Sequence, residues 1–340
     1  MTARRALVAA AVAVALAALA VPAQAGRSAP KKLAPIPVIG IGEQNPQIFS
    51  NPYFKALGVK QVRYITAWDS LRHKWSRDIL DEYMSAARAA HVEVMLGFGH
   101  ARSPNRTIRR RVPPVKEFTR EFLKYRKRYP WVKTWLTWNE ANHCGEPTCH
   151  KARRVARFYN NMRHNCFGCQ IVGADVLDTP TMVPWIKVFK RTARKDKMIW
   201  GLHNYIDANR FRTTGTRELI KAAPYGQIWF TETGGLVVRR NRSRIAFPGN
   251  KKHAAAATKQ VFKLAALSPR VRRVYIYHWQ PSTEPLPTWD SALVDPRGKP
   301  RPAYRVLKSY IRKFARLAQR RREASERASQ PPGAVGVIEG

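Results

Sequence analysis

Two glutamates, Glu140 and Glu232, each directly follow a short run rich in aromatic and β-branched residues. The chain has only 22 acidic residues, so chance alone does not readily place both there. Two facing carboxylates suit glycosidic bond cleavage, in which one protonates the leaving oxygen and the other attacks or stabilises the anomeric centre. Structural roles stay open at this stage, because Glu140 could cap the next helix and Glu232 could pair with an arginine.

The elements that would position these glutamates follow an alternating pattern from residue 37 onward. Short β-branched and aromatic runs alternate with amphipathic stretches of helical length, which is typical of βαβ units and a parallel sheet. The candidate strands are residues 38–42, 61–65, 93–98, 134–139, 171–175, 199–203, 227–231 and 274–278. Helical patterns between them include residues 115–128, 151–164, 183–195, 216–223 and 253–267.

These repeats predict an α/β fold, a (β/α)8 TIM barrel, as a single catalytic domain over residues 37–311. A doubly wound sheet fits less well, and no Gly-rich dinucleotide or phosphate loop follows any strand, so we expect no cofactor. Barrel active sites lie on the loops after the strands. Polar or aromatic residues recur at those strand ends: Arg63, His100, Asn139-Glu140, His203-Asn204-Tyr205, Glu232 and His278-Trp279.

At these positions the sequence resembles the clan A glycoside hydrolases, which include the family 5 and family 39 enzymes. In that clan an Asn-Glu pair ending the fourth strand supplies the acid/base, and a Glu ending the seventh supplies the nucleophile. Asn139-Glu140 and Glu232 match this pattern, and Ala141 departs from the Pro that often follows the acid/base. Further matches to family 5 are Arg63 (second strand), His100 (third), His203-Asn204-Tyr205 (sixth) and Trp279 (eighth).

The resemblance, which spans residues 37–310, implies a retaining mechanism with Glu140 as acid/base and Glu232 as nucleophile. We expect Arg63 and Tyr205 to favour the charged form of Glu232, and an apolar setting beside Trp138 to keep a proton on Glu140. Asn139 would bond the sugar 2-hydroxyl, and Trp279 would stack under the ring. His100 and His203 are either substrate contacts or satisfied structural histidines. Trp68, Trp75 and Trp289 are either further sugar platforms or packing residues.

The N-terminus has the pattern of a secretory signal. Arg4 and Arg5 precede an apolar run over residues 6–21, and Ala23-Gln24-Ala25 is a small-residue cleavage pattern. We therefore expect a signal peptide over residues 1–25, cleaved after Ala25, a linker over 26–36 and a secreted protein. A membrane anchor is the alternative, but the run is short and Ala-rich, and no later segment has the roughly 18 apolar residues needed to span a bilayer.

Four cysteines, Cys144, Cys149, Cys166 and Cys169, lie close to His143, His150 and His164, which superficially resembles a zinc cluster. The predicted helix over residues 151–164 separates the two cysteine pairs by about 21 Å, at 1.5 Å per residue. One metal ion could not join its two ends, so we expect local disulfides, Cys144 to Cys149 and Cys166 to Cys169, and no metal site. A redox role for the second pair is a lesser alternative.

Charge is the anomaly of this sequence, because 62 basic and 22 acidic residues leave a net charge of +40. The basic residues are dispersed and form no nucleic-acid motif, so we expect an anionic polymer rather than a specific nucleic acid as partner. An Arg-rich proteome would also explain the charge. Residues 312–340 read as a basic helix leading into a disordered tail.

The leading hypothesis is a secreted, monomeric, retaining glycoside hydrolase that cleaves a β-linked polysaccharide or glycoconjugate, with an acidic cell-wall polymer as one candidate substrate. The competing hypothesis is a noncatalytic barrel that binds anionic cell-wall glycans or other polyanions through its basic surface. Loss of either glutamate would favour the second hypothesis, and both are present.

Overall fold

A computed structural model describes residues 34–240, 247–282 and 288–329. The predicted signal segment, most of the linker over 26–36 and the end of the tail lie outside these residues. Within them, no helix combines the length and the apolar character needed to cross a membrane.

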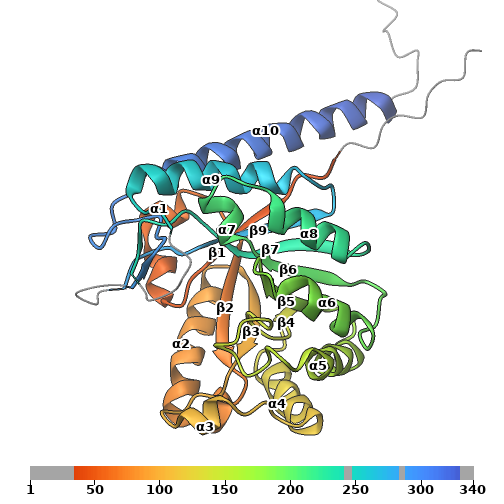
Figure 1. Ribbon diagram of the computed structural model, residues 1–340. Helices are drawn as coiled ribbons and strands as arrows, with labels where there is room; N and C mark the ends of the chain where they lie inside the picture. The colour runs from red at the N-terminus through yellow and green to blue at the C-terminus, as the bar shows by residue number, and fades with distance from the viewer. Residues whose placement is uncertain (1–33, 241–246, 283–287, 330–340) are drawn as a thin grey trace, which may run out of the picture. The chain divides into compact units, whose positions relative to one another are not determined.

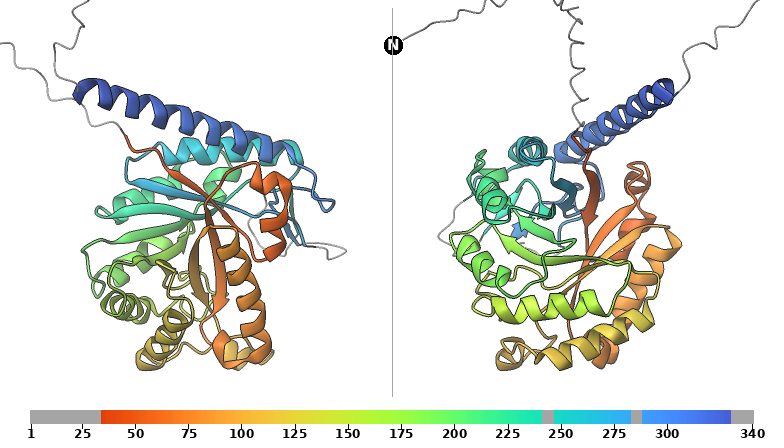
Figure 2. Two further views of the ribbon diagram at one scale, coloured as in Figure 1. Left: turned by 180° about the vertical axis from the view of Figure 1, so that it is seen from behind. Right: turned by 90° about the vertical axis from the view of Figure 1, so that its right-hand side faces the viewer.

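Eight parallel strands close into a barrel in the order β1-β2-β3-β4-β5-β6-β7-β9, and helices surround it (Figures 1 and 2). This confirms the predicted (β/α)8 fold. The barrel strands are β1 (Val38–Gly42), β2 (Gln61–Ala67), β3 (Glu93–Gly99), β4 (Thr134–Leu136), β5 (Gln170–Leu177), β6 (Ile199–His203), β7 (Gln227–Thr233) and β9 (Val271–Tyr277). The short strands β8 (Val238–Arg239) and β10 (Trp289–Asp290) form a separate antiparallel pair.

Helices lie between and after the barrel strands, and the longer ones bury an apolar face. They are α1 (Pro52–Lys55), α2 (Lys74–Ala89), α3 (Arg106–Arg109), α4 (Val115–Arg128), α5 (Ala152–His164), α6 (Met182–Lys190), α7 (Tyr205–Asn209), α8 (Thr214–Ala222), α9 (Lys251–Ala265) and α10 (Pro302–Ser329), with 3-10 turns η1 (Pro46–Ser50) and η2 (Ser70–Arg72). Helix α4 has the predicted bounds, and the others agree within a few residues at most ends.

Two apolar clusters hold the fold together. The smaller one fills the barrel interior with Met95, Leu136, Val172, Ile199, Trp229 and Tyr275. The larger one lies between the strands and the surrounding helices. A filled interior means that the barrel is a packed core, and in this fold the active sites lie on the loops at the carboxyl end.

Helix α10 continues without a break through the predicted domain boundary at residue 311. Its aromatic residues explain the continuation, because Tyr310 stacks on Phe262 of α9 at 4.0 Å between ring centroids. Phe314, one turn later, contacts the same ring edge-on at 5.8 Å. The start of the predicted basic segment is therefore packed on α9, along which α10 lies in Figure 1.

Candidate active site

A cavity of about 970 Å³ opens at the carboxyl ends of the barrel strands. Of the residues predicted from sequence, Glu140, Glu232 and Tyr205 line it. Tyr277, at the end of β9, and Trp289, on β10, line it as well. We call this cavity the catalytic cleft.

Glu140 enters the cleft because its chain leaves the barrel ladder early. Strand β4 ends at Leu136, whereas the sequence predicted a strand to residue 139. Beyond it, the backbone N–H of Asn139 donates to the carbonyl of Phe98, and that of Ala141 donates to the carbonyl of Asp175. Glu140 itself has a φ of 48°, a left-handed conformation that is uncommon for residues other than glycine and recurs at functional sites.

Glu232 lies on β7, and its carboxylate has a donor on each oxygen. Arg63 Nη1 donates to Oε2 at 2.7 Å, and the Tyr205 hydroxyl donates to Oε1 at 3.0 Å. The side chain is 13% exposed, against 25% for Glu140. Two donors, one from β2 and one from the start of α7, therefore fix the position of this carboxylate.

The two glutamates face each other across a short gap. Three atoms lie within 4.8 Å of one another: one carboxylate oxygen of Glu140, one of Glu232 and a ring nitrogen of His203. His203 Nδ1 is 3.3 Å from Glu140 Oε1 and 3.9 Å from Glu232 Oε2. The spacing of this trio is also one that a metal ion could use.

Beneath the glutamates lies a buried layer of charge. The Asp175 carboxylate, at 1% exposure, is 3.1 Å from His203 Nε2 and 3.6 Å from Arg63 Nη2. Its other oxygen accepts a hydrogen bond from the hydroxyl of Thr231. Gly201 on β6 leaves room for this arrangement, since a Cβ there would collide with the Asp175 carboxylate. His203 is thus held between Asp175 on one side and Glu140 on the other.

The sequence predicted that Glu140 keeps a proton, and the structure favours the opposite protonation state. Burial alone would lower the pKa of His203, but the carboxylates of Asp175, Glu232 and Glu140 raise it to about 10. For Glu140, burial favours the neutral form, but the hydrogen bond and charge of His203 outweigh burial and lower its pKa. At neutral pH, the proton that Glu140 and His203 could share therefore resides on His203, because that ring is surrounded by negative charge.

No protein-family model matches the chain, and no curated protein sequence matches it. Its fold is shared with glycoside hydrolases. GH5_18 of Streptomyces cattleya, solved with GlcNAc, superposes with a TM-score of 0.59 at 14% identity, covering 83% of this chain and 81% of that one. Xylanase 10B of Thermotoga maritima gives 0.55 at 14% identity, over 81% and 94% of the two chains. A family 39 glycoside hydrolase of Bacteroides cellulosilyticus gives 0.53 at 14%, over 81% and 63%.

Two tryptophans predicted to serve the substrate do not reach the cleft. Trp279 is 1% exposed and packs edge-on against Phe54 and Tyr304, so the prediction of a sugar platform there is wrong. Trp138 is fully buried against aromatic side chains, and its Nε1 donates to Glu146, so it is a packing residue rather than a substrate contact. Large aromatic side chains gain most when they are fully buried.

The remaining predicted residues act on other side chains. Arg63, 3% exposed, donates to both Glu232 and Asn139, and Asn139 accepts this bond through its Oδ1 at 2.5 Å. His203 is 0% exposed and lies between Glu140 and Asp175, so its ring is placed to act on these carboxylates rather than to touch a substrate. His100 is not among the cleft residues, and its Nδ1 lies 2.8 Å from a Glu146 oxygen.

Three residues that sequence reasoning missed or left open belong to the site. Asp175 ends the predicted strand over residues 171–175, so the strand-end rule would have found it. Tyr277 lies two residues before the favoured Trp279 and takes the position at the mouth. Trp289, left open between platform and packing, lines the cleft and contacts the Tyr205 ring edge-on at 4.8 Å.

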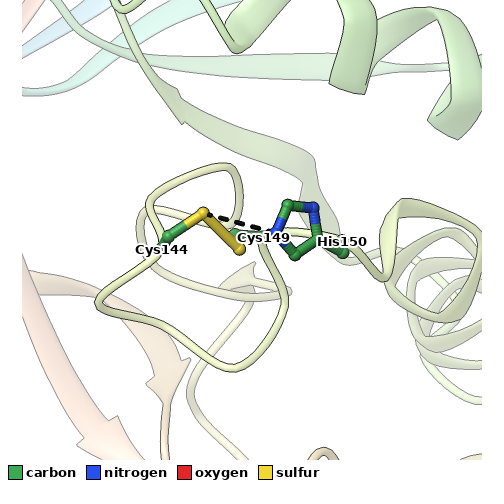
Figure 3. A group of neighbouring side chains, drawn as sticks. All are labelled: Cys144, Cys149 and His150. Carbon is green, nitrogen blue, oxygen red and sulfur yellow. Dashed lines mark hydrogen bonds between the residues drawn. A yellow bond between two sulfur atoms is a disulfide. The ribbon is translucent and has the colours of Figure 1, made fainter.

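The cysteines pair locally, as expected. Cys144 and Cys149 form a disulfide with a Cα distance of 4.9 Å, and Cys166 and Cys169 form another at 5.5 Å. Figure 3 shows His150 beside the first disulfide, with its Nε2 at 3.8 Å from Cys144 Sγ. Sulfur atoms bonded to each other are not thiolate ligands. The Cys144–Cys149 disulfide instead closes the loop that follows Glu140.

Proposed function

We propose that the protein is a secreted retaining glycoside hydrolase that cleaves O-glycosidic bonds of a β-linked polysaccharide or glycoconjugate. The observation that carries this proposal is the pair Glu140 and Glu232, whose nearest carboxylate oxygens lie within 4.8 Å in one cleft. Retaining enzymes hold their carboxyl groups about 5 to 5.5 Å apart, whereas inverting enzymes need about 6.5 to 9.5 Å to admit a water molecule. The short gap supports the retaining mechanism.

In the first step, Glu232 is the nucleophile. Its oxygen forms a bond to the anomeric carbon while the bond from that carbon to the leaving oxygen breaks. Arg63 and Tyr205 hold the carboxylate in place before the reaction. Because these donors are already aligned, little reorganisation is needed when the covalent bond forms.

Glu140 delivers a proton to the leaving oxygen in this step and takes one from water in the second. At rest, the proton of the Glu140–His203 pair is on the ring nitrogen 3.3 Å from Glu140 Oε1. We therefore assign the acid function to this pair, with Glu140 as the group that touches substrate and His203 as the group that holds its proton.

Two alanine variants test the roles separately. Glu140→Ala should slow cleavage of substrates with poor leaving groups by about 10²- to 10⁴-fold. It should still be glycosylated by activated aryl β-glycosides, and added azide should speed release as the β-glycosyl azide. Glu232→Ala should lose turnover of every substrate, and azide should give the opposite anomer. Glu117→Gln, an α4 carboxylate paired with Arg72, is the control and should behave as wild type.

Anomeric configuration followed by NMR on a panel of neutral and acidic glycans would identify the stereochemistry and the substrate. Near-normal rates for both alanine variants would show that the carboxylates are structural. Tight binding of glycans without hydrolysis of any of them would favour the noncatalytic barrel instead.

A further inference from the structure

A second cavity, of about 790 Å³, lies between the first turns of α5 and α6. The loop closed by the Cys144–Cys149 disulfide contributes to its lining, next to His150. We call it the α5–α6 pocket. It is separate from the catalytic cleft, with which it shares no lining residue.

The lining of this pocket is strongly basic. Lys151, Arg153, Arg154 and Arg157 contribute to it, and none of its described lining residues is Asp or Glu. Within the described ranges, Lys151, Arg153 and Arg157 form no ion pair, in contrast to Arg72, Arg128 and Arg163, which do. Arg153 and Arg157 are one helical turn apart and so lie on the same face of α5. Unpaired cations of one sign create a local field that favours an anion.

The two helix starts add to that field. Neither α5 nor α6 has an acidic residue in its first turn, and neither N-cap residue makes a side-chain capping bond. The positive ends of two helix dipoles therefore accompany the cationic side chains at one cavity.

The size and the apolar part of the pocket indicate a ligand larger than a simple anion. Pro180, Pro184 and Trp185 line it, and the Trp185 ring is fixed by a hydrogen bond from its Nε1 to the carbonyl of Thr148. A sugar ring has both an apolar face and polar substituents, and cavities of roughly 300 to 1,000 Å³ suit small organic ligands. An anionic sugar unit would use both the cations and this apolar surface.

Asn142 lines the pocket and links it to residues of the catalytic cleft. It follows Glu140 by two residues, is 1% exposed, and bonds to Thr181 of the pocket at 3.2 Å. Its other bonds are to Leu177 and Thr179, which line the cleft. A saccharide chain in the cleft would therefore have this basic pocket as the next cavity beyond the Glu140 loop.

We propose that the α5–α6 pocket is a subsite for an anionic sugar unit, bearing a carboxylate or a sulfate, of a saccharide chain that extends into the catalytic cleft. The extension into the cleft rests on the proposed function, whereas the anion site rests on the pocket itself. The protein would thus prefer acidic over neutral glycans of the same length.

The test measures binding, which does not require turnover. Isothermal titration would compare β-1,4-linked tetraglucuronic acid, sulfated cellotetraose and neutral cellotetraose on the wild-type chain and on Arg153→Ala/Arg157→Ala. The matched control, Lys259→Ala/Arg305→Ala, removes the same charge from another surface cavity, beside α10. We expect the pocket variant to raise Kd for an acidic tetrasaccharide about tenfold or more, as loss of charged hydrogen bonds does. Cleavage of a small neutral aryl glycoside should not change.

The outcomes separate the two proposals. Selective loss of acidic binding in the pocket variant, even in a chain that hydrolyses nothing, would support the subsite. Equal loss in both variants would show that binding follows net charge and would overturn it, as would failure of the wild type to bind any acidic probe. Inorganic phosphate that competes as strongly as the tetrasaccharides would mark a simple anion site and overturn the saccharide assignment. The results with tetraglucuronic acid and with sulfated cellotetraose would distinguish a carboxylate from a sulfate.

Discussion

Replacement of Asp175 by Asn removes a buried carboxylate while keeping the size of the side chain. That carboxylate lies 3.1 Å from His203 Nε2 and 3.6 Å from Arg63 Nη2, and His203 is fully buried. After burial itself, which opposes it, Asp175 is the largest cause of the raised pKa of His203. The variant should therefore lower the pKa of His203 and destabilise the fold.

The size of the effect follows from the two pKa values of His203. The change from 6.5 in the unfolded chain to about 10 in the fold corresponds to about 5 kcal/mol, at about 1.4 kcal/mol for each pKa unit. Because the folded-state pKa is the higher one, this stabilisation is fully present below pH 6.5 and is lost as the pH rises through 10. Asp175→Asn should cost about 3–5 kcal/mol at pH 6.5, the range for breaking a buried ion pair, and clearly less at pH 10.

Urea unfolding at pH 6.5, 8 and 10 and constant ionic strength would measure these costs. Asp290→Asn is the matched control, because Asp290 pairs with Arg301 at 2.7 Å and both side chains are buried. A guanidinium group does not titrate in this range, so the cost of the control should not depend on pH. If Asp175→Asn cost the same at pH 6.5 and pH 10, Asp175 would not be what keeps His203 protonated, and the reasoning on proton placement would be wrong.

Two further predictions concern the aromatic residues after β9 and the Cys144–Cys149 disulfide. Trp279→Ala should lower the free energy of unfolding by about 3–5 kcal/mol, as loss of a buried Trp does, with KM unchanged, whereas Tyr277→Ala should raise KM or lower kcat with a smaller loss of stability. Urea unfolding and steady-state kinetics would check both, and the reverse pattern would restore Trp279 as the platform. Cys144→Ser/Cys149→Ser should cost about 2 kcal/mol, the chain-entropy value for so short a loop, and reductant should no longer affect its unfolding. Unchanged stability would mean that the disulfide does not constrain this loop.

Much of the barrel could be predicted from the chain because its strands are short, β-branched runs between amphipathic helices. Strands β1 and β6 have the predicted bounds. The strand-end rule also placed Glu140 and Glu232 in one cleft, since all parallel strands of a closed barrel end on the same face. The rule gives the level of a residue along the barrel and does not give the direction of its side chain.

At the end of β9, the sequence prediction chose the wrong aromatic side chain to face the cleft. The strand ends at Tyr277, which pairs with Gly42 of β1, and the chain then turns so that Trp279 packs under the surrounding helices. Both aromatic residues lie near a strand end, and sequence alternation alone could not separate them. The packing partners Phe54 and Tyr304 come from distant parts of the chain, and they decide which ring is buried.

The sequence by itself determined the barrel, the two glutamates at its mouth and the local pairing of the cysteines, because each depends on residue type and spacing along the chain. Only the tertiary structure decided where the proton of the site resides. The register between β5 and β6 pairs Asp175 with Gly201, which leaves space for the carboxylate to reach His203. The carboxylate raises the pKa of the histidine, and the charged histidine lowers the pKa of Glu140. Proton positions depend on distances and burial among residues from different strands, which no spacing in one sequence contains.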